Sequence, residues 1–252
     1  MVLGGFCSEE HCHIRGPAFT ACCAACNASS GFASSPGRAA QPVVFFHHTP
    51  KTGGSTIECA TQGLAGWINL GHAVPGPAVV EACVARHCAR AFGPSPRVLR
   101  VVSVRNPFTY YESQYYFARA ALRRMVRPFV SPLAYGLFRR RQTHLALDNN
   151  FTQFMHAVLT DDTWRHEVGL TETLGRICGR PCRPDAVLHT EQLADDFAAV
   201  LRMAGRPPRP LPTAGVNSIT AQDREPPVAW TDALRGAVRT HDASVFEQFL
   251  YR

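Results

Sequence analysis

The residues of this chain best suited to phosphate chemistry lie in one short turn, His48-Thr-Pro-Lys-Thr-Gly-Gly-Ser55. Lys51 is the only lysine among the 26 lysine and arginine residues of a 252-residue chain. Lysine offers a compact positive charge, glycine lets the backbone approach a ligand closely, and serine and threonine add hydroxyl groups. Between a strand and a helix, such a turn also presents backbone N–H groups to an anion. The predicted phosphate-binding residues are Lys51, Thr52, Gly53, Gly54, Ser55 and Thr56.

This turn differs from the P-loop of nucleoside triphosphatases. The P-loop motif G-x-x-x-x-G-K-[ST] places its glycines before the lysine, whereas Lys51 precedes Gly53 and Gly54. A P-loop enzyme also ends a neighbouring strand with an aspartate that helps to hold Mg²⁺, but here Arg105 follows the next apolar segment. We therefore expect a site that binds the phosphates of a nucleotide without a metal ion. A nucleotide kinase is the alternative enzyme, and it would depend on Mg²⁺.

Short apolar runs and longer amphipathic segments alternate along the chain. Strands are predicted over 43–46, 98–104 and 186–189, because such short, largely apolar runs are typical of strands buried on both faces. Helices are predicted over 55–64, 77–92, 108–127, 151–159, 191–204 (capped by Gly205) and 231–250. This alternation predicts an α/β fold, P-loop-like and three-layered, with a mainly parallel central sheet flanked by helices. Residues 1–41 show neither the helical nor the strand period of apolar residues. We expect them to form a poorly ordered segment that precedes a single domain, 42–252.

Two motifs in this order resemble those of the sulfotransferases that use 3′-phosphoadenosine 5′-phosphosulfate (PAPS). The turn from His48 to Ser55 resembles their 5′-phosphosulfate loop. The segment Arg105-Asn-Pro-Phe-Thr-Tyr-Tyr-Glu-Ser113 resembles their 3′-phosphate motif, which begins Arg-Asp-Pro and has a serine eight residues after the arginine; Asn106 replaces the aspartate. Residues 188–197 and 242–251 resemble later helices of the family. The likeness is closest to carbohydrate sulfotransferases of the heparan sulfate 2-O/6-O type and their bacterial and algal relatives.

The resemblance implies transfer of a sulfuryl group from PAPS to an acceptor hydroxyl or amine, with adenosine 3′,5′-bisphosphate as the product. It implies that the residues from Lys51 to Thr56 bind the 5′-phosphosulfate, and that Arg105 and Ser113 bind the 3′-phosphate. Lys51 would also stabilise the charge that develops on the bridging oxygen as the S–O bond breaks. No metal ion is expected to take part.

An acceptor hydroxyl needs a general base, and histidine has the appropriate pKa. His72 is the first candidate, because its Gly-His segment resembles that of the 6-O-type relatives. His48 is the second, although it is also interpreted as a loop residue that orients the turn. His47 should point to the opposite face of its strand and pack in the core. Glu58 and Glu112 are further alternatives, since some relatives use a glutamate.

An arginine-rich stretch follows the second motif and suggests an anionic acceptor. Its members are Arg119, Arg123, Arg124, Arg127, Arg139, Arg140 and Arg141. Guanidinium groups suit sulfate and carboxylate, so the stretch is interpreted as a wall for an anionic polysaccharide, or else as a solvated helix face. Tyrosines 110, 111, 115 and 116 and Phe117 are expected in the core rather than against a sugar. The net charge of +7 either favours an anionic partner or reflects composition alone.

The acceptor is therefore expected to be a carbohydrate, and no nucleic acid ligand is expected. A small alcohol, phenol or lipid acceptor is one alternative. A catalytically silent, nucleotide-binding relative is another.

The ten cysteines leave two interpretations open. Cys178 with Cys182, and Cys83 with Cys88, are plausible local disulfides in an oxidising compartment. The cysteines between residues 7 and 26, together with His13, would alternatively form a zinc site, although their spacing matches no standard zinc ribbon.

The sequence gives mixed indications of the compartment. Asn27-Ala-Ser and Asn150-Phe-Thr are glycosylation sequons, which matter in a secretory protein. The resemblance suggests the Golgi lumen or membrane, whereas the sequence shows no convincing signal peptide, which leaves a soluble cytosolic enzyme open. Membrane association is expected only through a missing or unrecognised anchor.

Overall fold

The computed structural model describes residues 41–70, 97–125, 145–146, 149–212, 224 and 227–251, with side chains left out for 121–125. The predicted helix over 77–92 and nearly all of the predicted N-terminal segment lie outside these residues. The described chain forms two compact units. The first extends to Val104 and resumes at Gly175, and the second holds the residues from Arg105 to Leu174 and those from 224 onward.

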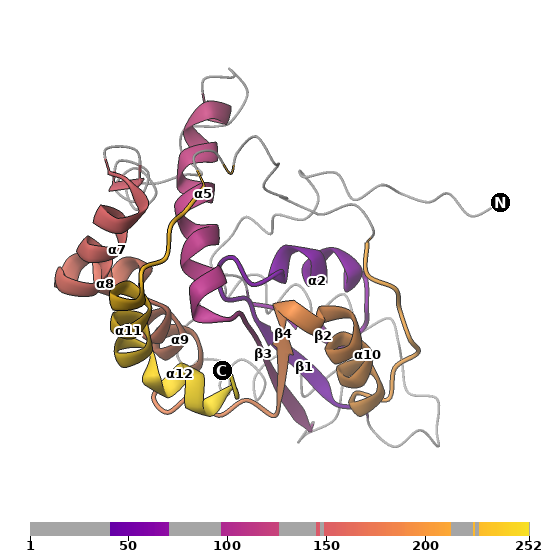
Figure 1. The fold of residues 1–252 in the computed structure, drawn as a ribbon. Helices are drawn as coiled ribbons and strands as arrows, with labels where there is room; N and C mark the ends of the chain where they lie inside the picture. Colours follow the sequence, from indigo (N-terminus) through magenta and orange to yellow (C-terminus); the bar gives the residue numbers. More distant parts are fainter. Residues whose placement is uncertain are drawn as a thin grey trace, which may run out of the picture. The chain divides into compact units, whose positions relative to one another are not determined.

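The first unit is built on a four-stranded parallel sheet (Figure 1). Its strands are β1 (Val43–His47), β2 (Trp67–Asn69), β3 (Val98–Val104) and β4 (Ala186–His189), in the order β2-β1-β3-β4. All three pairings are parallel. The three predicted strands and the predicted α/β class, with a parallel sheet flanked by helices, are confirmed. The edge strand β2 was not predicted, because three residues are too few to show a period.

Both faces of the central strand β1 are buried, which explains its uninterrupted apolar sequence. Val44 and Phe46 pack on one face in a cluster that includes Ile57 of α2 (Gly54–Ala60) and Phe197 of α10 (Leu193–Met203). These two helices therefore cover the same face of the sheet, as Figure 1 shows. Val43 and Phe45 are equally inaccessible on the opposite face. The sheet thus forms the rigid core from which the turn after β1 emerges.

The end of α10 follows the sequence prediction. Gly205 has a positive φ of 64°, which glycine adopts without a steric penalty. Its N–H donates to the Arg202 carbonyl, and the Arg206 N–H donates to the Leu201 carbonyl at 2.8 Å. These two bonds form a Schellman cap. The helix starts differently, because a 3₁₀ turn (Thr190–Gln192) precedes it.

The second unit is helical. It contains α5 (Pro107–Met125), α7 (Phe151–Thr160), α8 (Asp162–Val168), α11 (Asp232–His241), α12 (Ala243–Gln248) and the start of α9 (Leu170–Cys178). The predicted helices over 108–127 and 151–159 are found, whereas α8 and α9 were not predicted. Tyr110, Tyr111, Tyr115 and Tyr116 are buried, so the prediction that they belong to the core is confirmed.

The predicted single closing helix over 231–250 is wrong, because the helix is interrupted at Asp242. The Asp242 side chain is fully buried and accepts hydrogen bonds from the Tyr111 hydroxyl at 2.8 Å and the Thr171 hydroxyl at 2.7 Å. The Thr171 N–H donates to the same carboxylate. Asp242 thus joins the two terminal helices to α5 and α9, and this requirement breaks the helix.

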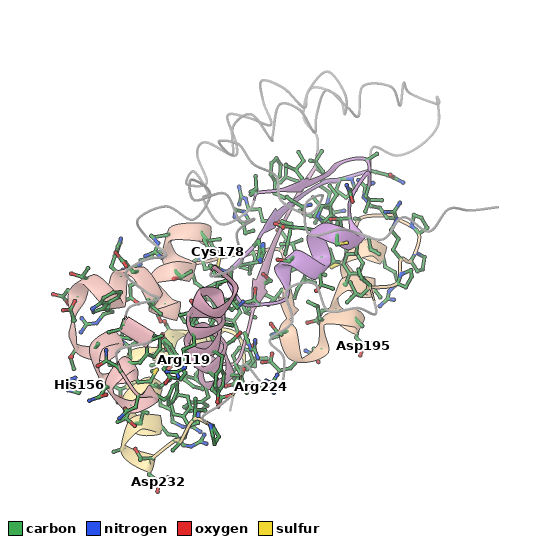
Figure 2. All side chains as sticks on the ribbon, turned by 90° about the horizontal axis from the view of Figure 1, so that it is seen from above. Arg119, His156, Cys178, Asp195, Arg224 and Asp232 are labelled. Carbon is green, nitrogen blue, oxygen red and sulfur yellow. A yellow bond between two sulfur atoms is a disulfide. The ribbon has the colours of Figure 1, made fainter. Side chains whose placement is uncertain are left out.

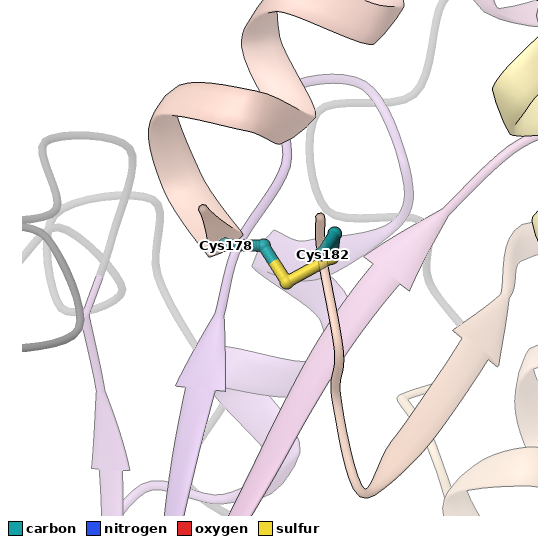
Figure 3. The surroundings of a disulfide bond; sticks show 2 residues. All are labelled: Cys178 and Cys182. Atoms are coloured by element: carbon teal, nitrogen blue, oxygen red, sulfur yellow. A yellow bond between two sulfur atoms is a disulfide. The ribbon is translucent and has the colours of Figure 1, made fainter. Parts of the chain in front are cut away.

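A disulfide joins Cys178 at the end of α9 to Cys182, as the sequence predicts (Figure 3). Cys59 is disulfide-bonded as well. The possible Cys83–Cys88 bridge and the possible zinc site lie outside the described residues. No described helix is both long and apolar enough to cross a membrane.

His47 is packed in the core, as the sequence predicts. It is 4% exposed, and no described residue hydrogen-bonds to its Nδ1 atom. The pKa of the His47 imidazole is lowered to about 4, mainly by burial. A backbone hydrogen bond at Ile177 raises this pKa in part, and the charge of Arg100 lowers it further. The folded chain therefore holds the neutral ring.

This burial predicts a loss of stability in mild acid. Because the folded pKa of about 4 is below the unfolded value of 6.5, the contribution of His47 is complete above pH 6.5 and is lost as the pH falls toward 4. The difference corresponds to ~3 kcal/mol. Urea unfolding at several pH values should show a steeper loss for the wild-type chain than for His47→Gln, which cannot be protonated. Parallel pH profiles for the two chains would contradict this account of His47.

Candidate phosphate-binding site

The turn after β1 lies at the place where open parallel sheets usually bind ligands. β1 is paired with β2 on one side and β3 on the other, so the strand order reverses beside it. Ligands of such sheets bind outside the carboxyl ends of the strands at this switch point. The predicted phosphate loop leaves the carboxyl end of β1, next to the end of β3. The topology thus places the loop where a ligand is expected.

Two residues of the turn have left-handed backbone conformations. Lys51 has a φ of 63° and Gly53 a φ of 75°. The conformation is unusual for a residue with a side chain, and such strained positions are concentrated at ligand sites. Left-handed residues within a turn help to orient successive N–H groups toward one point. The single lysine is therefore held in a conformation that the surrounding structure must impose.

Four successive backbone N–H groups of the turn make no hydrogen bond of standard geometry to any described residue. They belong to Thr52, Gly53, Gly54 and Ser55. The first backbone bonds of α2 are donated by Thr56 and Ile57, both to the Gly53 carbonyl. Buried or half-buried N–H groups without an acceptor are rare in proteins. This row of donors, next to Lys51, suits the oxygens of a phosphate group.

The Thr52 side chain anchors the turn to β3. Its hydroxyl is fully buried and donates to the Thr49 carbonyl at 2.6 Å, and it also lies 2.6 Å from Ser103 Oγ. The Thr49 N–H donates to the same Ser103 oxygen. The Thr52 hydroxyl therefore positions the loop, and only the backbone N–H of Thr52 is left as a predicted ligand group. Ser103 was not predicted, since nothing local in the sequence links it to Thr52.

His48 braces the start of α2. Its Nδ1 atom lies 2.9 Å from Glu58 Oε1, and its ring is stacked on Phe46, on the opposite side of β1 from His47. Gly54 gives the ring its room, because a Cβ atom there would overlap the imidazole. His48 and Glu58, both candidate bases from the sequence, thus form one pair. Its geometry fits the interpretation of His48 as the residue that orients the turn.

The segment after β4 contacts the same turn. The Thr190 hydroxyl donates to the Val104 carbonyl at 2.9 Å. A Cβ atom on Gly53 would lie 2.8 Å from Leu193 Cδ2, so a larger side chain there would have to displace Leu193. Asp196 fixes this segment, because its Oδ2 atom accepts from the His189 N–H at 2.7 Å and lies 2.8 Å from His189 Nδ1. This second histidine–carboxylate pair was not predicted.

The second motif opens α5 in the other unit. Asn106 caps the helix, since its Oδ1 accepts from the Phe108 N–H at 3.0 Å. Asparagine and aspartate cap helices equally well, so Asn106 leaves the turn intact. Arg105 Nε donates to Thr109 Oγ1 at 3.0 Å, which directs Arg105 along the helix face that carries Ser113 one turn later. Thr109, which was not singled out from the sequence, is thus a hydrogen-bond partner of Arg105.

The structure describes only some of the other predicted site residues. His72 and Arg127 lie outside the described residues, as do the side chains of Arg123 and Arg124. Arg119 is half-buried, and its guanidinium donates to the Ala146 carbonyl and the Tyr115 hydroxyl, both at 3.2 Å (Figure 2). Arg119 therefore makes hydrogen bonds within its own unit. Glu112 accepts a hydrogen bond from the Trp230 indole N–H at 2.6 Å.

Among the described residues, no three His, Cys, Asp or Glu side chains are grouped to hold a metal ion.

Comparison with known proteins gives no relative: no protein-family model, curated protein or solved structure matches this chain. The function must therefore be argued from the residues of the site.

The close approach of Gly54 to His48 predicts the effect of one methyl group. Gly54→Ala should lower the free energy of unfolding by about 2 kcal/mol, because the added Cβ overlaps the His48 ring. Gly236→Ala is the matched control: Gly236 lies inside α11 with no atom near its Cβ position, so that change should stabilise by about 0.5–1 kcal/mol.

Denaturant unfolding of both variants, repeated in a His48→Ala background, identifies the cause. Removing the imidazole should abolish most of the cost of Gly54→Ala. An equal cost in both backgrounds would show that His48 does not require the glycine.

Proposed function

We propose that this chain is a sulfotransferase that binds PAPS and transfers its sulfuryl group to an acceptor hydroxyl or amine. The observation that carries the proposal is a row of N–H groups, from Thr52 to Ser55, for which no described residue is a hydrogen-bond acceptor of standard geometry. The row lies beside the only lysine, at the switch point of a parallel sheet. Such donors match the oxygens of a 5′-phosphosulfate. The geometry of the second motif supports the same nucleotide, because Arg105 and Ser113 share one helix face.

The donor set fits this nucleotide in charge and chemistry. Backbone N–H groups and the Lys51 ammonium favour a phosphate, and the planar guanidinium of Arg105 suits a second phosphate at the ribose 3′ position. Lys51 would stay close to the bridging oxygen and stabilise its charge as the S–O bond breaks. Thr52, His48 and Leu193 would act indirectly, by holding the turn in shape.

The general base in this proposal is His72, on the ground of the family resemblance. His48 is given a different role, because the residue is 3% exposed and its ring is paired with Glu58. It positions the turn, and Glu58 orients it. The acceptor is proposed to be a carbohydrate, with an anionic polysaccharide as the partner that the arginine-rich stretch would favour. A nucleotide kinase is the competing function, and it predicts a preference for ATP with Mg²⁺.

Calorimetric binding of adenosine 3′,5′-bisphosphate, without a metal ion, tests the nucleotide site. Lys51→Ala and Arg105→Lys should each weaken binding about 10-fold or more, because a charge-assisted hydrogen bond contributes roughly 1.5–3 kcal/mol. Arg202→Ala is the matched control, since it removes an exposed positive charge from the last turn of α10 and should leave binding unchanged.

Lys51 also allows a direct footprint, because it is the only lysine in the chain. Amine acetylation should modify Lys51 and the N-terminus, and the bisphosphate should protect Lys51 alone. Binding that is absent, that prefers ATP with Mg²⁺, or that leaves Lys51 unprotected would contradict the proposed function.

A further inference from the structure

The sequon Asn150-Phe-Thr152 lies where the chain enters α7, the helix that carries His156 in Figure 2. Asn150 and Thr152 are both exposed, whereas Phe151 between them is 5% exposed and packs against Tyr115 and Trp230. The buried phenyl ring fixes the segment in the core. The two sequon side chains are thereby held at the surface of the folded unit.

The Asn150 side chain uses only one of its two polar atoms in the fold. Its Oδ1 atom accepts from the Gln153 N–H at 3.0 Å, and Gln153 Oε1 accepts from the Asn150 N–H at 3.0 Å, which completes a capping box. No described residue accepts a hydrogen bond from Asn150 Nδ2. A substituent on Nδ2 therefore leaves the helix cap in place.

We infer that Asn150 is a site of N-linked glycosylation. The co-reactant is an oligosaccharide linked to a lipid pyrophosphate. The bond between the sugar C1 and the pyrophosphate oxygen breaks, a bond forms between C1 and Asn150 Nδ2, Nδ2 loses a proton, and the lipid pyrophosphate leaves. The product keeps an amide oxygen, which continues to cap α7.

A second feature of the structure fits the same compartment independently. Cys178 and Cys182 form a disulfide, and such bonds persist in oxidising compartments, where N-linked glycans are also attached. The inference does not depend on the proposed sulfotransferase activity, because it concerns a different surface and a different reaction. Either one can fail while the other stands.

The test is site-resolved mass spectrometry of the full chain, secreted from a eukaryotic cell behind a cleavable leader. Peptide-N-glycosidase treatment in heavy-oxygen water should convert Asn150 into labelled aspartate in most molecules. Peptide mapping separates this site from the other sequon, at Asn27. Thr152→Ser should keep the modification, and Thr152→Ala should remove it, although both leave the Asn150 cap unchanged.

Asn150→Asp provides the check on folding, because aspartate caps a helix as well as asparagine but has no amide nitrogen to modify. It should be secreted with an unchanged melting temperature and without a glycan at this position. The inference is overturned if Asn150 is unmodified in the secreted wild-type chain, or if Thr152→Ala retains the label.

Discussion

The attachment of the turn after β1 to strand β3 is the contact on which the site depends. Thr52 enters the interior completely, and its hydroxyl meets the Thr49 carbonyl and Ser103 Oγ at 2.6 Å each. A buried hydroxyl network of this kind is costly if any member lacks a partner, so it fixes one conformation. In that conformation Lys51 lies in the left-handed region, and no described residue accepts a standard hydrogen bond from the N–H groups that follow it.

Close packing then maintains this shape from two sides. The His48 ring covers Gly54 from the end of β1, and Leu193 covers Gly53 from the segment after β4. A side chain on Gly54 would overlap the His48 ring, and one on Gly53 would have to displace Leu193 and adopt an unfavourable positive φ. The histidine–carboxylate pairs of the first unit, His48 with Glu58 and His189 with Asp196, hold these two neighbours in place. The two glycines are therefore favoured by contacts from distant parts of the chain.

Local patterns made much of the fold predictable. The strands over 43–46, 98–104 and 186–189 were evident because each is a short apolar run, and the Gly205 cap because it follows an amphipathic helix. The break in the closing helix could not be predicted, because Asp242 is hydrogen-bonded by Tyr111 and Thr171, which are 131 and 71 positions away. The same limit applies at the site: the loop composition predicted a phosphate site, but the role of Thr52 depends on Ser103, 51 residues later. Pairwise partners at such separations leave no trace in a single sequence.

The central claim is that the turn after β1 holds the 5′-phosphate of a nucleotide. A crystal structure of the chain with adenosine 3′,5′-bisphosphate tests it most directly. The expected result is a 5′-phosphate against the backbone N–H groups of residues 52–55 and the Lys51 ammonium. A nucleotide bound elsewhere, or one whose 5′-phosphate does not touch this turn, would contradict it.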